Sequence, residues 1–95
     1  MIENFNYTRA INQAVSVERI ASELRSIANN RLKSKYAAIG AAWSGTNATN
    51  YLRHCTETTS QILDKASTLD SIASRMRSVA RILRDAEENV KRMLK

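Results

Sequence analysis

The stretch Ala37–Tyr51 reads Ala-Ala-Ile-Gly-Ala-Ala-Trp-Ser-Gly-Thr-Asn-Ala-Thr-Asn-Tyr. It contains both glycines of the 95-residue chain, Gly40 and Gly45, and its single tryptophan, Trp43, and the chain has no proline. Glycine tolerates positive φ and commonly ends a helix. Because no other strong helix breaker is present, this stretch predicts the one turn of the chain, over residues 40–46.

The composition bounds the fold around this turn. Apolar residues make up 43% of the chain and charged residues 25%, which is typical of a globular domain. Aromatic residues are only 5%, while Ala, Leu, Ile and Arg are frequent, and this balance favours helix over strand. We therefore predict a single all-α domain over residues 1–95, an antiparallel two-helix hairpin.

The first helix is predicted over residues 8–39. Asn6 or Thr8 supplies a side-chain oxygen to cap it. Apolar residues then recur at alternating spacings of four and three, a heptad pattern that Ile20 and Ile27 widen. The positions of this pattern are Ala10, Ala14, Val17, Ala21, Leu24 and Ala28. The pattern blurs at Arg31 and Lys35.

The second helix is predicted over residues 47–91, with Thr46 or Asn47 as its N-cap. Its heptad positions are Leu52, Cys55, Thr59, Ile62, Ala66, Leu69, Ala73, Met76, Ala80, Leu83, Val90 and Leu94, and only Glu87 interrupts them. A second apolar edge runs beside them through Tyr51, Ile72, Val79, Ala86 and Met93. One hairpin cannot cover both rows, so the pattern implies a second chain. We also expect the residues beyond about Val79 to outrun the first helix.

Several kinds of site find no support. Cys55 is the single cysteine and His54 the single histidine, so disulfide, zinc and Cys/His catalytic arrangements lack partners. There is no phosphate-binding glycine loop and no paired-carboxylate site. We predict no enzyme activity, no cofactor and no metal. The first ten residues lack the apolar core of an export signal, and no apolar run is long enough to span a membrane.

The net charge of +6 raises nucleic-acid binding as a rival hypothesis. Arg77, Arg81 and Arg84 share one side of the second helix. However, Arg81–Asp85 and Arg84–Glu88 are spaced as i,i+4 ion pairs, and no aromatic side chain interleaves with these arginines to stack on bases. The sequence therefore favours a solvated or partner-facing flank over a nucleic-acid site.

Trp43-Ser44-Gly45, centred between two amphipathic helices in a chain of this length, resembles the WXG family. These small Trp-x-Gly proteins, similar to early secreted antigenic targets, are exported by type VII (ESX) secretion systems. Tyr51 matches an aromatic residue that the family often places early in its second helix. The run from Ile72 to Glu88 is similar to the family's C-terminal half.

The resemblance implies a hairpin that dimerises into a four-helix bundle, with itself or with a second WXG protein. It implies export without a cleaved signal peptide, by the secretion ATPase and its membrane apparatus, and possible association with a larger effector. Trp43 and Gly45 would form the turn and recognition motif. The dimer and core positions would be Val17, Leu24, Leu52, Ile62, Leu69, Met76 and Leu83.

The chain departs from the family at the export signal, which is usually Tyr-x-x-x-Asp/Glu near the C-terminus. Glu87 and Glu88 are present, but Leu83 and Arg84 stand where the tyrosine is expected. We therefore expect an incomplete signal, which either a partner chain supplies or a different surface replaces. In the dimer that the resemblance implies, Trp43 of one chain and the C-terminal segment of the other would form a composite surface. An intracellular structural adaptor or chaperone for a larger toxin remains the third hypothesis.

Overall fold

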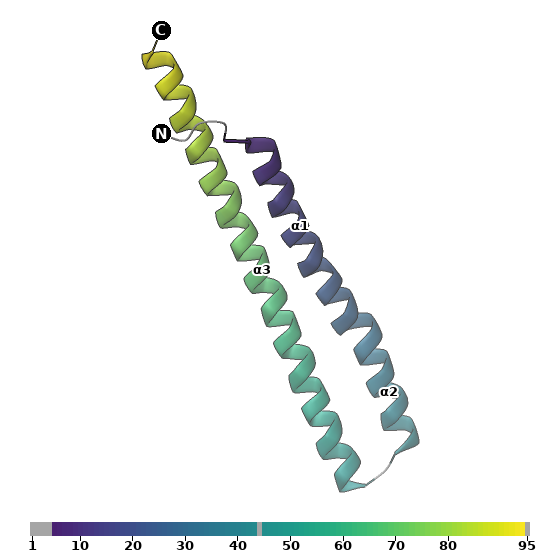
Figure 1. The fold of residues 1–95 in the computed structure, drawn as a ribbon. Coiled ribbons are helices and arrows are strands. Elements are labelled where there is room, and N and C mark those ends of the chain that lie inside the picture. The colour runs from purple at the N-terminus through teal and green to yellow at the C-terminus, as the bar shows by residue number, and fades with distance from the viewer. Residues whose placement is uncertain (1–4, 44, 95) are drawn as a thin grey trace.

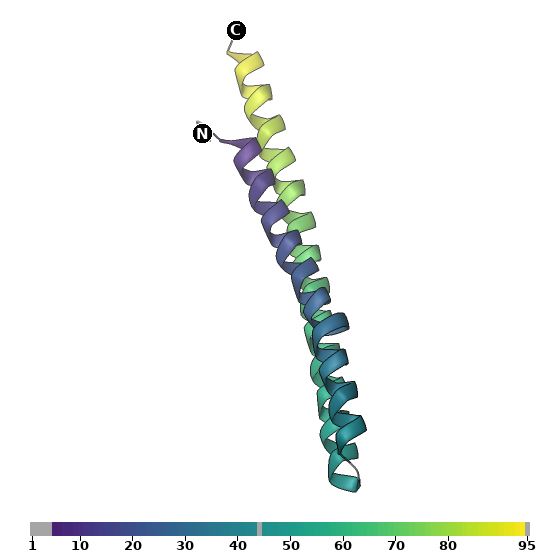
Figure 2. The same cartoon turned by 90° about the vertical axis from the view of Figure 1, so that its right-hand side faces the viewer.

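The computed structural model describes residues 5–43 and 45–94 as an all-helical hairpin (Figure 1). The first arm contains α1 (Tyr7–Ser26), a short π-helix η1 (Ile27–Leu32) and α2 (Lys33–Ala42), which follow one another without a break. The second arm is one helix, α3 (Thr46–Met93), of 48 residues. The arms run antiparallel in a rod of 76 × 16 × 12 Å, two helices thick, with the start of α1 and the end of α3 toward the same end of the rod (Figures 1 and 2). The prediction of an all-α fold is confirmed.

The helix ends differ in detail from the sequence prediction. Asn6 caps α1, since its side chain accepts a hydrogen bond of 2.9 Å from the backbone N–H of Arg9. Gly40 does not end the first arm, which continues through it to Ala42, so the turn is shorter than the expected 40–46. The N-cap of α3 is Gly45 rather than Thr46 or Asn47, and no side chain of the described residues caps this end.

Small residues form the buried line between the two arms. Ala14, Ala21 and Ala28 repeat every seven residues in the first arm and are fully buried. Their counterparts in α3 are Thr59, Ala66, Ala73 and Ala80, each at most 3% exposed. We call these seven positions the alanine column. Their small side chains let the helix backbones approach closely, because the distance between packed helices depends on the side chains at the contact.

The two flanks of the alanine column differ in polarity. The residues three positions after Ala14, Ala21, Ala66 and Ala73 are apolar: Val17, Leu24, Leu69 and Met76. The residues four positions after them are charged: Glu18, Arg25, Asp70 and Arg77. In an antiparallel pair, equal offsets fall on the same side of the contact, so the hairpin has one apolar face and one charged face.

The π-helix η1 explains why the heptad pattern blurs at Arg31 and Lys35. A π-turn adds one residue to the helical repeat and rotates everything after it. As a result Leu32, Tyr36 and Ile39 lie half-buried against α3, whereas Arg31, Lys35 and Ala38, which an uninterrupted heptad would place there, are exposed. The π-turn in η1, which we call the wide turn, thus keeps the charged side chains of Arg31 and Lys35 out of the contact between the arms.

This account predicts that Asn30 can be deleted at little cost. Deletion removes the extra residue and turns η1 into ordinary α-helix, while the contacts on both sides keep their partners. We expect the free energy of unfolding to change by no more than about 1 kcal/mol, measured by urea denaturation.

Deletion of the exposed Ser74 in the middle of α3 is the matched control. No wide turn is present there to absorb the change, so the apolar positions on one side rotate by about 100° away from the contact. We expect a loss of more than about 3 kcal/mol. Equal losses for the two deletions would show that η1 does not set the register.

Candidate interaction surfaces

The apolar face of the hairpin is only half-covered. Its central positions are Val17, Leu24, Ile62, Leu69, Met76, Leu83 and Val90, and all of them are partly exposed. Flanking them, Ile20, Ile72 and Val79 are 48%, 44% and 52% exposed. Among the described residues, no large side chain is fully buried. The dimer and core positions expected from the sequence therefore lie together on this face, apart from Leu52, which contacts the first arm at Gly40.

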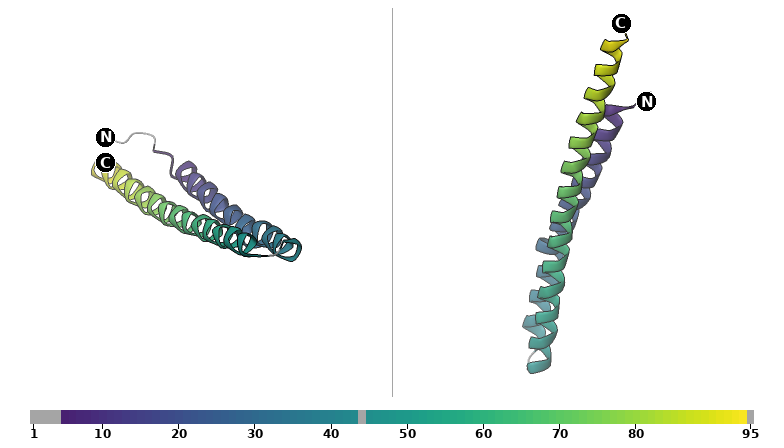
Figure 3. Two further views of the ribbon diagram at one scale, coloured as in Figure 1. Left: turned by 90° about the horizontal axis from the view of Figure 1, so that it is seen from below. Right: turned by 90° about the vertical axis from the view of Figure 1, so that its left-hand side faces the viewer.

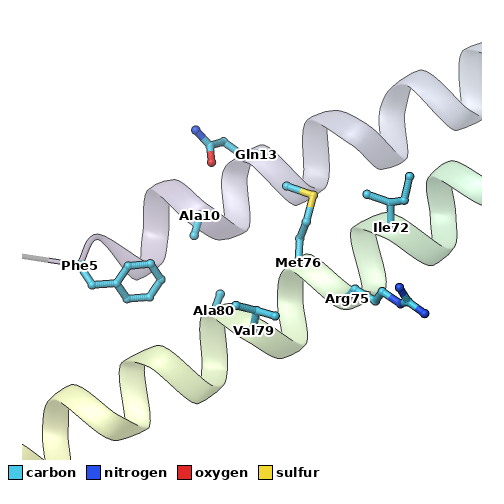
Figure 4. A pocket seen from close by; sticks show the side chains of 8 residues that line it. All are labelled: Phe5, Ala10, Gln13, Ile72, Arg75, Met76, Val79 and Ala80. Atoms are coloured by element: carbon cyan, nitrogen blue, oxygen red, sulfur yellow. The ribbon is translucent and has the colours of Figure 1, made fainter. Parts of the chain in front are cut away.

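A groove of about 500 Å³ interrupts the apolar face near the open end of the rod (Figure 4). It forms where the first arm offers only the small Ala10 and the polar Gln13 opposite Met76 and Val79. Met76 reaches across from α3 toward α1, and Phe5 lies at one end of the groove. The alanine-rich contact leaves this space unfilled, and its walls are mainly apolar.

Among the described residues, the charged face carries two ion pairs between the arms. Arg77 binds both carboxylate oxygens of Glu18, at 2.6 and 3.3 Å, and Arg25 binds Asp70. The hydrogen bond and the charge of Glu18 raise the pKa of Arg77 above its already high ordinary value. Since all four side chains are about one-third exposed or more, solvent screens both pairs and they add little to stability. Their role is to fix which sides of the helices meet.

These pairs change the interpretation of the arginine flank. The expected i,i+4 pairs Arg81–Asp85 and Arg84–Glu88 do not form. Arg84 instead contacts the adjacent Asp85 at 3.3 Å, and the nearest polar partner of Arg81 is the Ser78 hydroxyl at 3.4 Å. With Arg77 bound to Glu18, the three arginines do not form a free basic patch.

The turn exposes two aromatic side chains. Trp43 is 55% exposed and Tyr51 46%, and their ring centroids lie 5.7 Å apart with the planes tilted by 34°. Trp43 therefore folds back on the first turns of α3 but is not buried there. Gly45 has φ 96° and ψ 178°, a conformation that only glycine adopts without strain.

The incomplete export signal lies where α3 passes the start of α1. Leu83 is half-buried, Glu87 pairs with Lys91 at 3.6 Å, and Glu88 is exposed. The guanidinium of Arg84 stacks 4.4 Å from the ring centroid of Tyr7. The start of α1 is thus level with Arg84, and α3 projects beyond it (Figure 3).

The projecting part of α3 is shorter than the sequence predicted. It begins at about residue 85 rather than at Val79, because the first arm extends past Gly40 and the turn falls later in the chain. We call residues 85–94 the overhang. Two of its apolar side chains, Met93 and Leu94, are 82% and 76% exposed. The contact between Tyr7 and Arg84 was not foreseen, because the two residues are 77 positions apart in the sequence.

Cys55 and His54 have no cluster of metal ligands around them in the part of the chain that the structure describes. Cys55 is buried as a free thiol, and His54 is exposed with Glu57 as its neighbour at 3.6 Å. Within residues 5–43 and 45–94, no three His, Cys, Asp or Glu side chains gather as a metal site would require. None of the described helices is long and apolar enough to cross a membrane.

Comparison with known proteins found no match among family models, curated proteins or solved structures.

The geometry of the turn predicts that alanine is tolerated at Gly40 but not at Gly45. Gly45→Ala forces a Cβ into the conformation at φ 96° and should destabilise the hairpin by about 1–3 kcal/mol. Gly40 is helical, and an added Cβ would lie 3.2 Å from the Leu52 Cδ1 methyl, the flexible end of a side chain. The higher helix propensity of alanine, worth up to about 1 kcal/mol, offsets this contact in Gly40→Ala.

Thermal melting followed by circular dichroism distinguishes these variants. A Gly45→Ala protein as stable as wild type would show that the turn adopts a different backbone conformation.

Proposed function

We propose that this protein is a small exported substrate or partner of a type VII (ESX-like) secretion system, acting by protein–protein contacts as a helical-hairpin dimer. The observation that carries the proposal is the position of the Trp-x-Gly motif. Trp43 and Gly45 occupy the tight turn between two long antiparallel helices, and Trp43 remains more than half exposed. This is the arrangement that the resemblance to the WXG family implies.

The apolar face supports the dimer. Every large apolar side chain among the described residues is partly exposed, so the hairpin loses much of the stabilisation that full burial would give, about 25 cal/mol per Å² of apolar surface. A second hairpin laid on this face covers both apolar rows and gives a four-helix bundle. The partner is a second copy of this chain or another Trp-x-Gly protein.

The overhang supports a composite export surface. In an antiparallel arrangement of two hairpins, the overhang of one chain reaches toward the turn of the other. Met93 and Leu94 would then approach the exposed Trp43 and Tyr51 of the partner. The overhang extends past the start of α1, so we expect its removal to cost the fold little.

Tyr7 supports a second way to complete the signal. The family motif places a tyrosine four residues before the acidic residue, and Arg84 holds that position relative to Glu88. The ring of Tyr7 lies against the Arg84 guanidinium, so an aromatic side chain stands beside the position where the motif requires one. The secretion machinery would read an aromatic ring from α1 and a carboxylate from α3.

Secretion of variants tests this proposal. Trp43→Phe, Tyr7→Ala and deletion of residues 86–95 should each lower the ratio of extracellular to cell-associated protein several-fold. Helix content by circular dichroism should stay close to that of wild type, because each change lies at an exposed or end position. Tyr7→Phe, which keeps the ring, is the matched control and should be secreted normally.

Three results would count against the proposal. Normal secretion of all three variants would remove the composite signal, and loss of helix content in all three would assign these residues to the fold. Failure to find the wild-type protein outside cells that carry the secretion system would favour the intracellular adaptor instead.

A further inference from the structure

The net positive charge of this chain is concentrated at the turn end of the rod. Residues 24–56 contain five of the fifteen basic residues and none of the nine acidic ones, and therefore carry +5 of the net charge of +6. Arg25 is bound to Asp70 of α3. The other four are exposed, and the described residues offer them no ion-pair partner. We call this set, Arg31, Lys33, Lys35 and Arg53, the basic collar.

Between Lys35 and Arg53 the chain carries no charged residue, and we call this segment at the turn end, residues 36–52, the tip. Its exposed positions include four alanines, Ala37, Ala38, Ala41 and Ala42, and the stacked pair Trp43 and Tyr51. Lys35 precedes Trp43 by eight residues, and Arg53 follows Gly45 by eight. At a rise of 1.5 Å per residue, the collar begins about 12 Å from the turn along each helix.

We propose that the tip docks on the surface of an anionic lipid bilayer, with Trp43 and Tyr51 in the headgroup layer and the basic collar against the lipid phosphates. This inference rests on the charge and exposure of the turn end and not on export, and it requires Trp43 and Tyr51 to be free of a partner's overhang when the tip docks. The binding is interfacial, and neither arm crosses the bilayer.

The dimensions fit this occupant. The headgroup layer on each side of a bilayer is roughly 5–8 Å thick, and interfacial segments enter to a depth of about 5–10 Å. An uncharged tip of about 12 Å fills that depth before the first lysine is reached, and long basic side chains extend to the phosphates. Tryptophan and tyrosine favour this layer because their rings are apolar with one polar group.

The same spacing argues against single-stranded nucleic acid. Proteins that bind it interleave cations with stacking aromatic rings, since each stacked base brings its own phosphate. The tip has no charged residue between Lys35 and Arg53, so bases stacked on Trp43 and Tyr51 would lack cations beside them. Two copies of this chain are also not expected to pair through their tips, because the basic collars, which have no acidic residues beside them, would repel each other.

Trp43 provides the probe, because it is the single tryptophan of the chain and lies in the tip. The purified full-length protein is mixed with vesicles of two thirds phosphatidylcholine and one third phosphatidylglycerol at low ionic strength. We expect a blue shift of tryptophan emission and protection from iodide quenching. Both effects should disappear with pure phosphatidylcholine vesicles and decline at high salt.

The double variant Lys33→Gln/Lys35→Gln should lower the vesicle partition coefficient by roughly tenfold to thirtyfold. Lys65→Gln/Lys91→Gln is the matched control, with the same residue types and charge change at exposed positions far from the turn, and it should bind within about threefold of wild type. Neither Lys33 nor Lys35 lies on the apolar face, so we expect the collar variant to be secreted normally. Loss of vesicle binding with normal secretion would therefore support the lipid contact without bearing on the export proposal.

Three results would overturn the inference: no emission change with anionic vesicles, equal binding by the two double variants, or stronger protection of Trp43 by a single-stranded oligonucleotide than by the vesicles. The last would assign the turn end to nucleic acid.

Discussion

Close contact between the two arms along the alanine column is the interaction on which the rest of this structure depends. Ala14, Ala21 and Ala28 face Ala66, Ala73 and Ala80, and all are at most 2% exposed. Small residues at the contact bring the helix axes together, but they bury little apolar area themselves. The large apolar side chains are displaced to one flank, where they are half-covered. In the described residues the hairpin thus has a well-defined register but no core of large side chains, and the proposal of a second chain rests on this property.

The alanine column also explains how much could be predicted from the sequence. The absence of proline, the two glycines and the heptad spacing were sufficient for an all-α chain with one turn near Trp43. The heptad pattern combined two rows, however. One is the buried alanine column, which contains Ala73, and the other is the apolar face beside it, which contains Met76. Spacing alone cannot separate them, because which row faces the other helix depends on how closely the helices approach.

Other features could not be predicted because they arise from contacts distant in sequence or from the backbone. The wide turn at Ile27–Leu32 was visible only as a blurred pattern at Arg31 and Lys35, and its cause became clear from the half-burial of Leu32 and Tyr36. The backbone conformation of Gly45 displaced Thr46 from the capping position that its side chain favours. To predict that Arg84 stacks on Tyr7, the register of the two arms would have to be known to within one helical turn. Of the candidate site, the motif Trp43–Gly45 was evident in the sequence. Tyr51 was evident as part of the second apolar edge and of the resemblance, but not as the aromatic neighbour of Trp43.

The central claim, that one hairpin is half of a stable unit, is tested most directly by sedimentation equilibrium of the pure protein over the micromolar range. The account predicts a species of twice the 10.7 kDa chain mass for a self-associating protein, or a poorly helical 10.7 kDa chain that becomes helical with its Trp-x-Gly partner. A 10.7 kDa species that keeps its full helical circular dichroism signal and melts cooperatively would contradict the claim, because the half-covered apolar face would then suffice without a partner.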